Sequence, residues 1–190
     1  MDGGGCNLKV VEENSKPRVR FSDVGLRILG LALTMVAAIV IGVDKETAVV
    51  SFTVTKTLPA VHVPVTAKWQ YLSSTVYFLL VNITACSYAA ASLIFSVVAS
   101  RNFKEHTSSL VLVILDLVMT ALLFSAEGAA IGVGLISRNG NSHVQWHKVC
   151  NMFKGFCRQM TAAVIMSLFG SFVFLWLVAL SILNLHKKSR

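Results

Sequence analysis

Four long runs of apolar residues, separated by polar segments, divide the chain. They cover residues 26–43, 71–100, 109–136 and 160–185. At about 1.5 Å per residue, helices of these lengths reach across the roughly 30 Å hydrocarbon core of a bilayer. The first does so if the arginine at its start reaches back to the lipid head groups. The pattern predicts an all-α membrane protein, with a bundle of four transmembrane helices between residues 24 and 185.

The polar segments define tails and loops around this membrane domain. Residues 1–23 hold three consecutive glycines and scattered charges, which is typical of a disordered tail. Residues 186–190 form a short basic tail. Two loops, about 44–68 and 137–158, are expected on the outer side of the membrane. The first is rich in β-branched residues, which favour a short strand or two.

Composition and charge support this class and suggest an orientation. A hydrophobic fraction of 55% and a mean hydropathy of +0.69 exclude an ordinary soluble domain. The net charge of +8 lies in tails and loops, where it suits lipid head groups better than nucleic acid. With both termini in the cytosol, nine lysines and arginines lie inside and seven outside. The inner charges are also closer to the ends of the spans, so we expect cytosolic N- and C-termini.

Two acids interrupt the third apolar run, and one of them has an obvious partner. An aspartate at the centre of a transmembrane helix costs about 2.5–3.5 kcal/mol, so it normally faces a partner, water or a pore. Asp116 lies about two turns into its span, and Arg27 begins the first span from the same side of the membrane. We expect a structural ion pair, because bidentate arginine–carboxylate geometry best compensates both desolvation costs. The alternatives are a proton or cation site at Asp116 and an Asp116 that faces polar side chains or water.

Glu127 follows Asp116 by 11 residues, about three helical turns, so the two acids share one face. They could line an ion path, or Glu127 could lie near the outer interface. The sequence assigns Glu127 no role.

Small residues recur at four-residue spacing, which in lipid favours close packing of helices. The candidates are Gly30, Thr34, Ala38 and Gly42 in the first run and Gly128 and Gly132, a GxxxG-type motif, in the third. The pattern does not separate contacts within one chain from contacts between copies.

Cys150 and Cys157 lie in the second outer loop, which this topology puts in an oxidising compartment. In a continuous helix they would be about 10 Å apart, too far for a disulfide. Gly155 between them permits a turn, so we expect a disulfide. The nearby His143 and His147 could imitate a zinc site, but oxidised cysteines cannot bind metal. No catalytic, cofactor-binding or metal-binding signature is found, so we expect no enzyme and no cofactor.

Several motifs occur together between residues 24 and 185. They are Leu26-Arg27-Ile28-Leu29 in the first run; Tyr77 to Asn82, Tyr88 and Ser92-Leu93 in the second; Leu115 to Met119, Leu122-Leu123 and Ser125-Ala126 in the third; and Gly140 to His143, Trp146, Val149 to Asn151 and Phe156-Cys157 in the second outer loop. In combination they resemble the CASP-like family of plants, which are relatives of the Casparian strip membrane domain proteins within the MARVEL-type four-span group.

The resemblance implies a multi-pass plasma-membrane protein that assembles with itself and with related four-span proteins. It also marks Arg27 and Asp116 as family hallmarks. Members that build the Casparian strip form immobile platforms that guide wall modification. The first loop, residues 44–68, lacks the short signature of those members, which speaks against targeting to that strip.

We therefore expect a non-enzymatic scaffold that organises a membrane domain or local cell-wall modification. Its expected partners are membrane lipids, homo- and hetero-oligomers, and secreted or wall-modifying enzymes, with no nucleic acid. One alternative is a small ion or solute channel or transporter that uses Asp116 and Glu127. A weaker one is an accessory subunit of another membrane protein.

Overall fold

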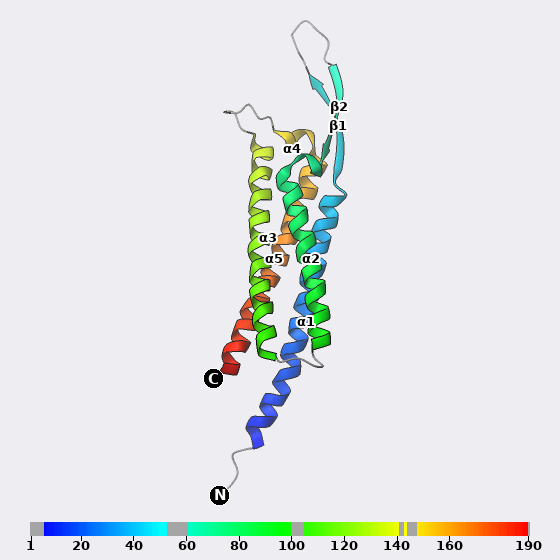
Figure 1. The fold of residues 1–190 in the computed structure, drawn as a ribbon. Helices are drawn as coiled ribbons and strands as arrows, with labels where there is room; N and C mark the ends of the chain where they lie inside the picture. The colour runs from blue at the N-terminus through cyan, green and yellow to red at the C-terminus, as the bar shows by residue number, and fades with distance from the viewer. Residues whose placement is uncertain (1–5, 53–60, 100–104, 141–142, 144–147, 190) are drawn as a thin grey trace.

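The computed structural model describes residues 6–52, 61–99, 105–140, 143 and 148–189. Four long helices dominate it, with a two-stranded hairpin and a short helix at one end (Figure 1). The elements are α1 Cys6–Gly42, β1 Lys45–Phe52, β2 Val61–Lys68, the 3-10 turn η1 Trp69–Tyr71, α2 Ser73–Ala99, α3 Glu105–Asn139, α4 Val149–Met152 and α5 Lys154–Ser189. His147, a candidate from the sequence, lies outside the described residues.

All four expected spans are present as helices long and apolar enough to cross a membrane. The apolar segments are Ser22–Gly42, Ser73–Ser96, Leu110–Asn139 and Lys154–His186. The expected all-α four-helix membrane fold is therefore confirmed. The fourth segment starts earlier than expected, because α5 includes residues 154–158 of the predicted loop 137–158.

Helix α1 is longer than its span. It begins at Cys6, so most of the stretch expected to be a disordered tail, residues 1–23, is helical in the structure. Once the apolar span is helical, each added residue gains a hydrogen bond without a new nucleation step. Pro17 opposes the extension because it has no N–H to donate, whereas residues 6–16 beyond it contain neither glycine nor proline.

The four long helices pack as a ring of neighbours. Helix α1 packs against α2 and α5, and α3 packs against the same two helices. Consequently α1 lies diagonally across the bundle from α3, and α2 lies diagonally across from α5. The start of α1 and the end of α5 lie at the same end of the bundle (Figure 1).

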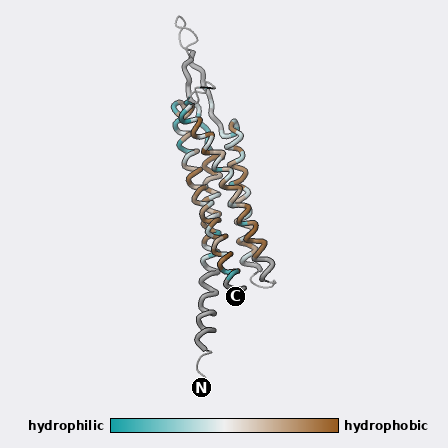
Figure 2. The backbone as a smooth tube through the Cα atoms, turned by 90° about the vertical axis from the view of Figure 1, so that its left-hand side faces the viewer, coloured by the Kyte–Doolittle hydropathy of each residue, from teal (hydrophilic) through white to brown (hydrophobic). Residues whose placement is uncertain are grey.

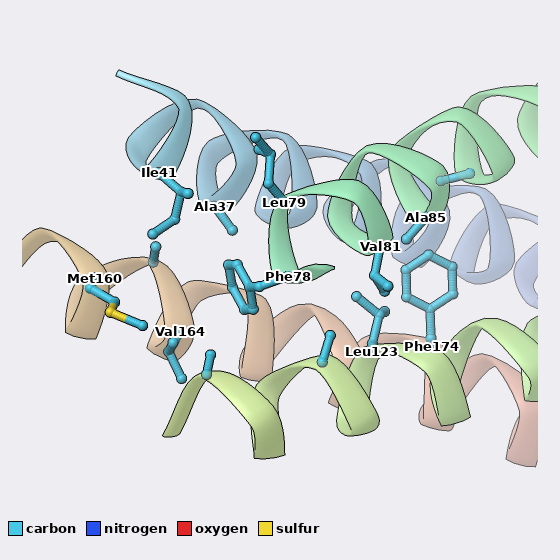
Figure 3. Close-up of a cluster of buried hydrophobic side chains, with 14 of the residues drawn as sticks. Ala37, Ile41, Phe78, Leu79, Val81, Ala85, Leu123, Met160, Val164 and Phe174 are labelled. Atoms are coloured by element: carbon cyan, nitrogen blue, oxygen red, sulfur yellow. The ribbon is translucent and has the colours of Figure 1, made fainter. Parts of the chain in front are cut away.

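The apolar core combines small residues with a few large ones. Figure 3 shows Phe78 of α2, Leu123 of α3 and Phe174 of α5 converging between the helices. Alanines at the contacts, such as Ala37 and Ala85, are fully buried and let the backbones approach closely. Many large aliphatic and aromatic side chains are exposed on the outside of the bundle, and Figure 2 shows hydrophobic positions recurring along its helices. An apolar exterior of this kind is suited to lipid.

The first outer loop forms an antiparallel hairpin that extends beyond the bundle (Figure 1). Its register pairs Lys45 with Lys68 and Val49 with Pro64. Proline has no N–H, but a two-stranded ribbon leaves one edge of each strand unpaired, where proline is tolerated. The expectation of a short strand or two in this loop is therefore confirmed.

The second outer loop is shorter than the predicted 137–158. Helix α3 continues to Asn139 and ends at Gly140, whose φ of 72° is the left-handed conformation that glycine adopts readily. The Gly140 N–H donates to the Ile136 carbonyl at 2.8 Å, which closes the last turn. After the loop, α4 and the start of α5 cap the bundle.

Candidate functional site

Arg27 of α1 and Asp116 of α3 meet inside the bundle as a bidentate ion pair. Arg27 Nη2 donates to Asp116 Oδ2 at 2.9 Å, and Nη1 donates to Oδ1 at 3.3 Å. Arg27 is 2% exposed and Asp116 is fully buried. The arginine does reach inward from the start of its span. Because α1 and α3 are diagonal, the long guanidinium side chain bridges two helices that share few other contacts.

Helix α2 completes the charged cluster, and this contribution was not anticipated from the sequence. The Tyr88 hydroxyl donates to Asp116 Oδ1 at 2.6 Å. Arg27 Nη1 also donates to Ser92 Oγ at 2.9 Å, and Arg27 Nε donates to Asp23 Oδ2 at 3.3 Å. Tyr88 and Ser92 are four residues apart and so lie on one helix face. In the sequence, two polar residues four apart within an apolar run were the signal that α2 could contribute to this cluster.

A buried charge pair is stabilising only when its remaining donors and acceptors are occupied. In this cluster both carboxylate oxygens of Asp116 accept hydrogen bonds, and all three guanidinium nitrogens of Arg27 donate. Removing one partner of such a pair typically costs about 3–5 kcal/mol, because an uncompensated charge remains buried. The cluster therefore joins the helices structurally, because Arg27 and Tyr88 already occupy both carboxylate oxygens of Asp116.

Glu127 is buried inside the bundle, at 2% exposure, about three turns beyond Asp116 along α3. Its Oε1 is 2.6 Å from Ser171 Oγ and 3.0 Å from Ser167 Oγ, both on α5. Ser167 Oγ is also 3.0 Å from Asn82 Oδ1 of α2. This second cluster therefore connects α2, α3 and α5, and the Asn82–Ser167 contact bridges the other diagonal of the bundle.

The two acids of α3 share an inward face, as their spacing predicted, but their clusters are separate. Leu123 lies between them on that face, is fully buried and packs in the core with Phe174 (Figure 3). Asp116 is already paired with Arg27. These contacts favour two structural clusters over the alternative of one polar path.

In the middle of α1, small residues pack against α5 of the same chain. A Cβ on Gly30 would lie 3.4 Å from the Phe174 ring, so Gly30 packs directly against that ring of α5. Thr34 is fully buried, and its Cγ2 would lie 3.3 Å from a Cβ on Gly170 of α5. Ala38 is half-buried and packs against the core.

The remaining glycines of the predicted packing motifs do not touch another helix of the same chain. A Cβ on Gly42, Gly128 or Gly132 would meet no atom within 4 Å. All three are exposed. The expectation of packing at Gly128 and Gly132 is therefore not met inside one bundle, because this side of α3 faces outward.

Cys150 of α4 and Cys157 of α5 are joined by a disulfide, with their Cα atoms 5.6 Å apart. The chain departs from helical geometry at Phe153, which separates α4 from α5 with φ −117° and ψ 69°. The turn that permits the bridge is therefore at Phe153, and the expectation that Gly155 would supply it is wrong. Gly155 is inside α5.

Glu46 connects the hairpin to the start of α5. Its Oε2 accepts the Phe156 N–H at 2.6 Å, and a carboxylate is favourable at a helix N-terminus. A Cβ on Gly155 would lie 3.2 Å from the same oxygen, so glycine leaves room for the carboxylate. Burial and the neighbouring Glu46 charge raise the pKa of Asp44, just before β1, to about 6.

Comparison with known proteins is consistent with these features. Residues 16–173 match the model of the Casparian strip membrane protein domain. The chain is 51% identical over 190 residues to CASP-like protein 1E1 of Vitis vinifera, covering 99% of this chain and 92% of the relative. It is 50% identical over 188 residues to CASP-like protein 1E2 of Vitis vinifera, with 99% and 94% covered. For CASP-like protein 1E1 of Populus trichocarpa the identity is 48% over 168 residues, with 88% and 84% covered.

No solved structure matches the chain significantly. The family model covers most of the sequence and includes both Arg27 and Asp116. The relatives align over nearly the full length at about half identity. The chain therefore belongs to the CASP-like family of Casparian strip membrane domain proteins.

Proposed function

We propose that this protein is a non-enzymatic plasma-membrane scaffold that associates with copies of itself and with related four-span proteins. Assembled in this way, it organises a membrane domain or local cell-wall modification. Membrane lipids surround it, and secreted or wall-modifying enzymes are its expected clients. Family membership supports this class of function, since the matching domain is that of Casparian strip membrane proteins.

The observation that carries the proposal is the unoccupied glycine face of α3. Gly128 and Gly132 are exposed within the span and have open space around them. Ile131 and Leu135, also outward, are 43% and 54% exposed. In lipid, glycines four residues apart let a second helix approach closely, and packing then replaces the absent hydrophobic driving force. A face of this kind is suited to a contact between chains.

The test replaces both glycines, Gly128→Ile and Gly132→Ile, and measures self-association. Because neither site has a neighbour within 4 Å, the monomer should fold normally. We expect co-purification of two differently tagged copies to fall severalfold and recovery after photobleaching to become faster. Gly25→Ile is the matched control, since Gly25 is an exposed helical glycine in another span with equally open surroundings. Unchanged association of the double variant would contradict the proposal.

The two ends of the bundle support a proposed orientation in the membrane. The disulfide of α4 and α5 lies at the end opposite the chain termini (Figure 1). Disulfides form and persist in oxidising compartments, so this end is proposed to face the cell exterior. The termini are then cytosolic, in agreement with the bias of basic residues. A protease-protection assay on tags at either terminus tests this, and cleavage from outside the cell would contradict it.

A further inference from the structure

The cluster around Glu127 contains more polar contacts than the serine hydrogens can satisfy. Ser167 Oγ lies 3.0 Å from both Asn82 Oδ1 and Glu127 Oε1. Ser171 Oγ lies 2.6 Å from Glu127 Oε1 and 3.2 Å from the Ser167 carbonyl oxygen. Asn82 Nδ2 donates to the Phe78 carbonyl at 2.9 Å, which fixes its amide orientation and leaves Oδ1 as an acceptor.

Each serine hydroxyl supplies one hydrogen, so only two hydrogens are available for these four polar contacts if Glu127 is ionised. A proton on Glu127 Oε1 supplies a third. Oε1–H then donates to Ser171 Oγ across the shortest contact, 2.6 Å. Ser171 is freed to donate to the Ser167 carbonyl, and Ser167 donates to Asn82. Three of the four contacts become hydrogen bonds with correct donors.

The second oxygen of Glu127 points to the same state. Oε2 is buried and has no hydrogen-bond partner. No charged or titratable side chain from any described element contacts the carboxyl; Ser167 and Ser171 are its only side-chain partners there. A buried charge without a counter-ion is far more costly than a carbonyl oxygen without a hydrogen bond. When Glu127 is a neutral acid, the only cost that remains is a carbonyl oxygen without a hydrogen bond.

A bound metal cation fits the same oxygens poorly. Calcium holds oxygen ligands at about 2.3–2.6 Å, which keeps ligands from different residues roughly 3 Å or more apart. The 2.6 Å separation of Glu127 Oε1 and Ser171 Oγ is instead that of a strong O–H···O hydrogen bond.

From these contacts we infer that Glu127 is an intramembrane proton-binding site, occupied in the folded protein, whose proton joins α2, α3 and α5. With the proton bound, Glu127 donates to Ser171, and Ser167 donates to Asn82. Ser171 and Asn82 in turn donate to the backbone carbonyls of Ser167 and Phe78. Since both ends are acceptors inside helices, the site stores a proton and does not conduct it. Losing that proton leaves an unpaired carboxylate among the helices and weakens their packing.

Infrared difference spectroscopy on the full chain in lipid tests the protonation state directly. Wild type minus Glu127→Gln should show the carbonyl stretch of one protonated carboxylic acid at neutral pH. Ser171→Ala should shift that band to higher frequency, because the acid loses its acceptor. Ser87→Ala is the matched control, since Ser87 lies exposed on α2 and bonds only its own helix at Ile83. If Glu127→Gln does not fold, the comparison of wild type with Ser171→Ala still reports the band.

Thermal stability supplies an independent readout. The melting temperature of wild type should fall as the pH becomes alkaline. The melting temperature of Glu127→Gln should stay constant, because its amide is a neutral mimic of the acid. Carboxylate bands in place of the acid band at neutral pH would overturn the inference. So would stabilisation of wild type, but not of Glu127→Gln, by sodium, potassium or calcium chloride over choline chloride at equal ionic strength, which would indicate a cation site.

Discussion

Removing the charge of Asp116 should be the most damaging single change in the membrane domain. Asp116→Ala leaves Arg27 buried, with only Ser92 and Asp23 to accept from it. It also removes the closer acceptor of the Tyr88 hydroxyl, which keeps only the Leu112 carbonyl at 3.3 Å. Breaking a buried pair costs about 3–5 kcal/mol, and a lost hydrogen bond to a charged group about 1.5–3 kcal/mol. These terms overlap, so we expect a loss of about 4–6 kcal/mol, against typical total stabilities of about 5–15 kcal/mol.

The assay combines a thermal melt of the purified protein with measurement of its delivery to the cell surface. Arg27→Lys is the graded control, because lysine keeps the charge but cannot form the bidentate contact. It should melt between wild type and Asp116→Ala. Normal surface delivery and an unchanged melt for Asp116→Ala would refute the reasoning.

A charge swap should recover part of the lost stability. In Arg27→Asp with Asp116→Arg, the ion pair is restored across the same diagonal. However, the new acid at position 27 would lie one turn from Asp23, where like charges repel. Adding Asp23→Asn should therefore improve the swap, and failure of both swapped forms to exceed Asp116→Ala would argue against a pairwise charge interaction.

Three further outcomes follow from the contacts. Tyr88→Phe should lower stability by about 1.5–3 kcal/mol in the same melt, and no loss would mean that its hydrogen bond to Asp116 is dispensable. Reducing the Cys150–Cys157 disulfide should loosen the start of α5, seen as faster amide exchange there, whereas unchanged exchange would show that other contacts suffice. Because the folded pKa of Asp44 is about 6, above its ordinary 3.8, its contribution to stability is present near pH 4 and lost as pH rises through 6. Asp44→Asn should remove that dependence, and an equal pH response in the variant would assign it elsewhere.

The spans and the charged pair were predictable because lipid imposes severe costs. An uninterrupted apolar run has few alternatives to a membrane helix, and a buried acid requires compensation. With one arginine near one span end and one aspartate at matching depth, Arg27 and Asp116 had few other partners. The disulfide was predictable from the position of both cysteines in one loop between spans, although their spacing in a continuous helix would have excluded it.

Other features depended on relations that spacing cannot supply. The spacing of small residues predicts close helix packing but does not identify the partner helix. Gly30 and Gly128 were therefore equally good candidates for packing within the chain until their surroundings were known. Glu127 lacked a cationic partner in the sequence, and its actual partners are ordinary serines. Ser167 and Ser171 are small residues four apart, a spacing that by itself predicts only helix packing, yet their hydroxyls face the acid. The contact of Glu46 with α5 joins positions 110 residues apart.

The diagonal position of the Arg27–Asp116 pair has a consequence for the order of synthesis. These residues are 89 positions apart, and two complete spans leave the ribosome before the third delivers the carboxylate. Until then the arginine of the first helix has Asp23 of its own helix as a counter-ion, but not the bidentate carboxylate of Asp116. A chain that stops before α3 therefore lacks the carboxylate that buries this arginine in the finished bundle. A chain stopped after α2 should be degraded quickly, and Arg27→Leu should lengthen its lifetime; equal lifetimes would contradict this role.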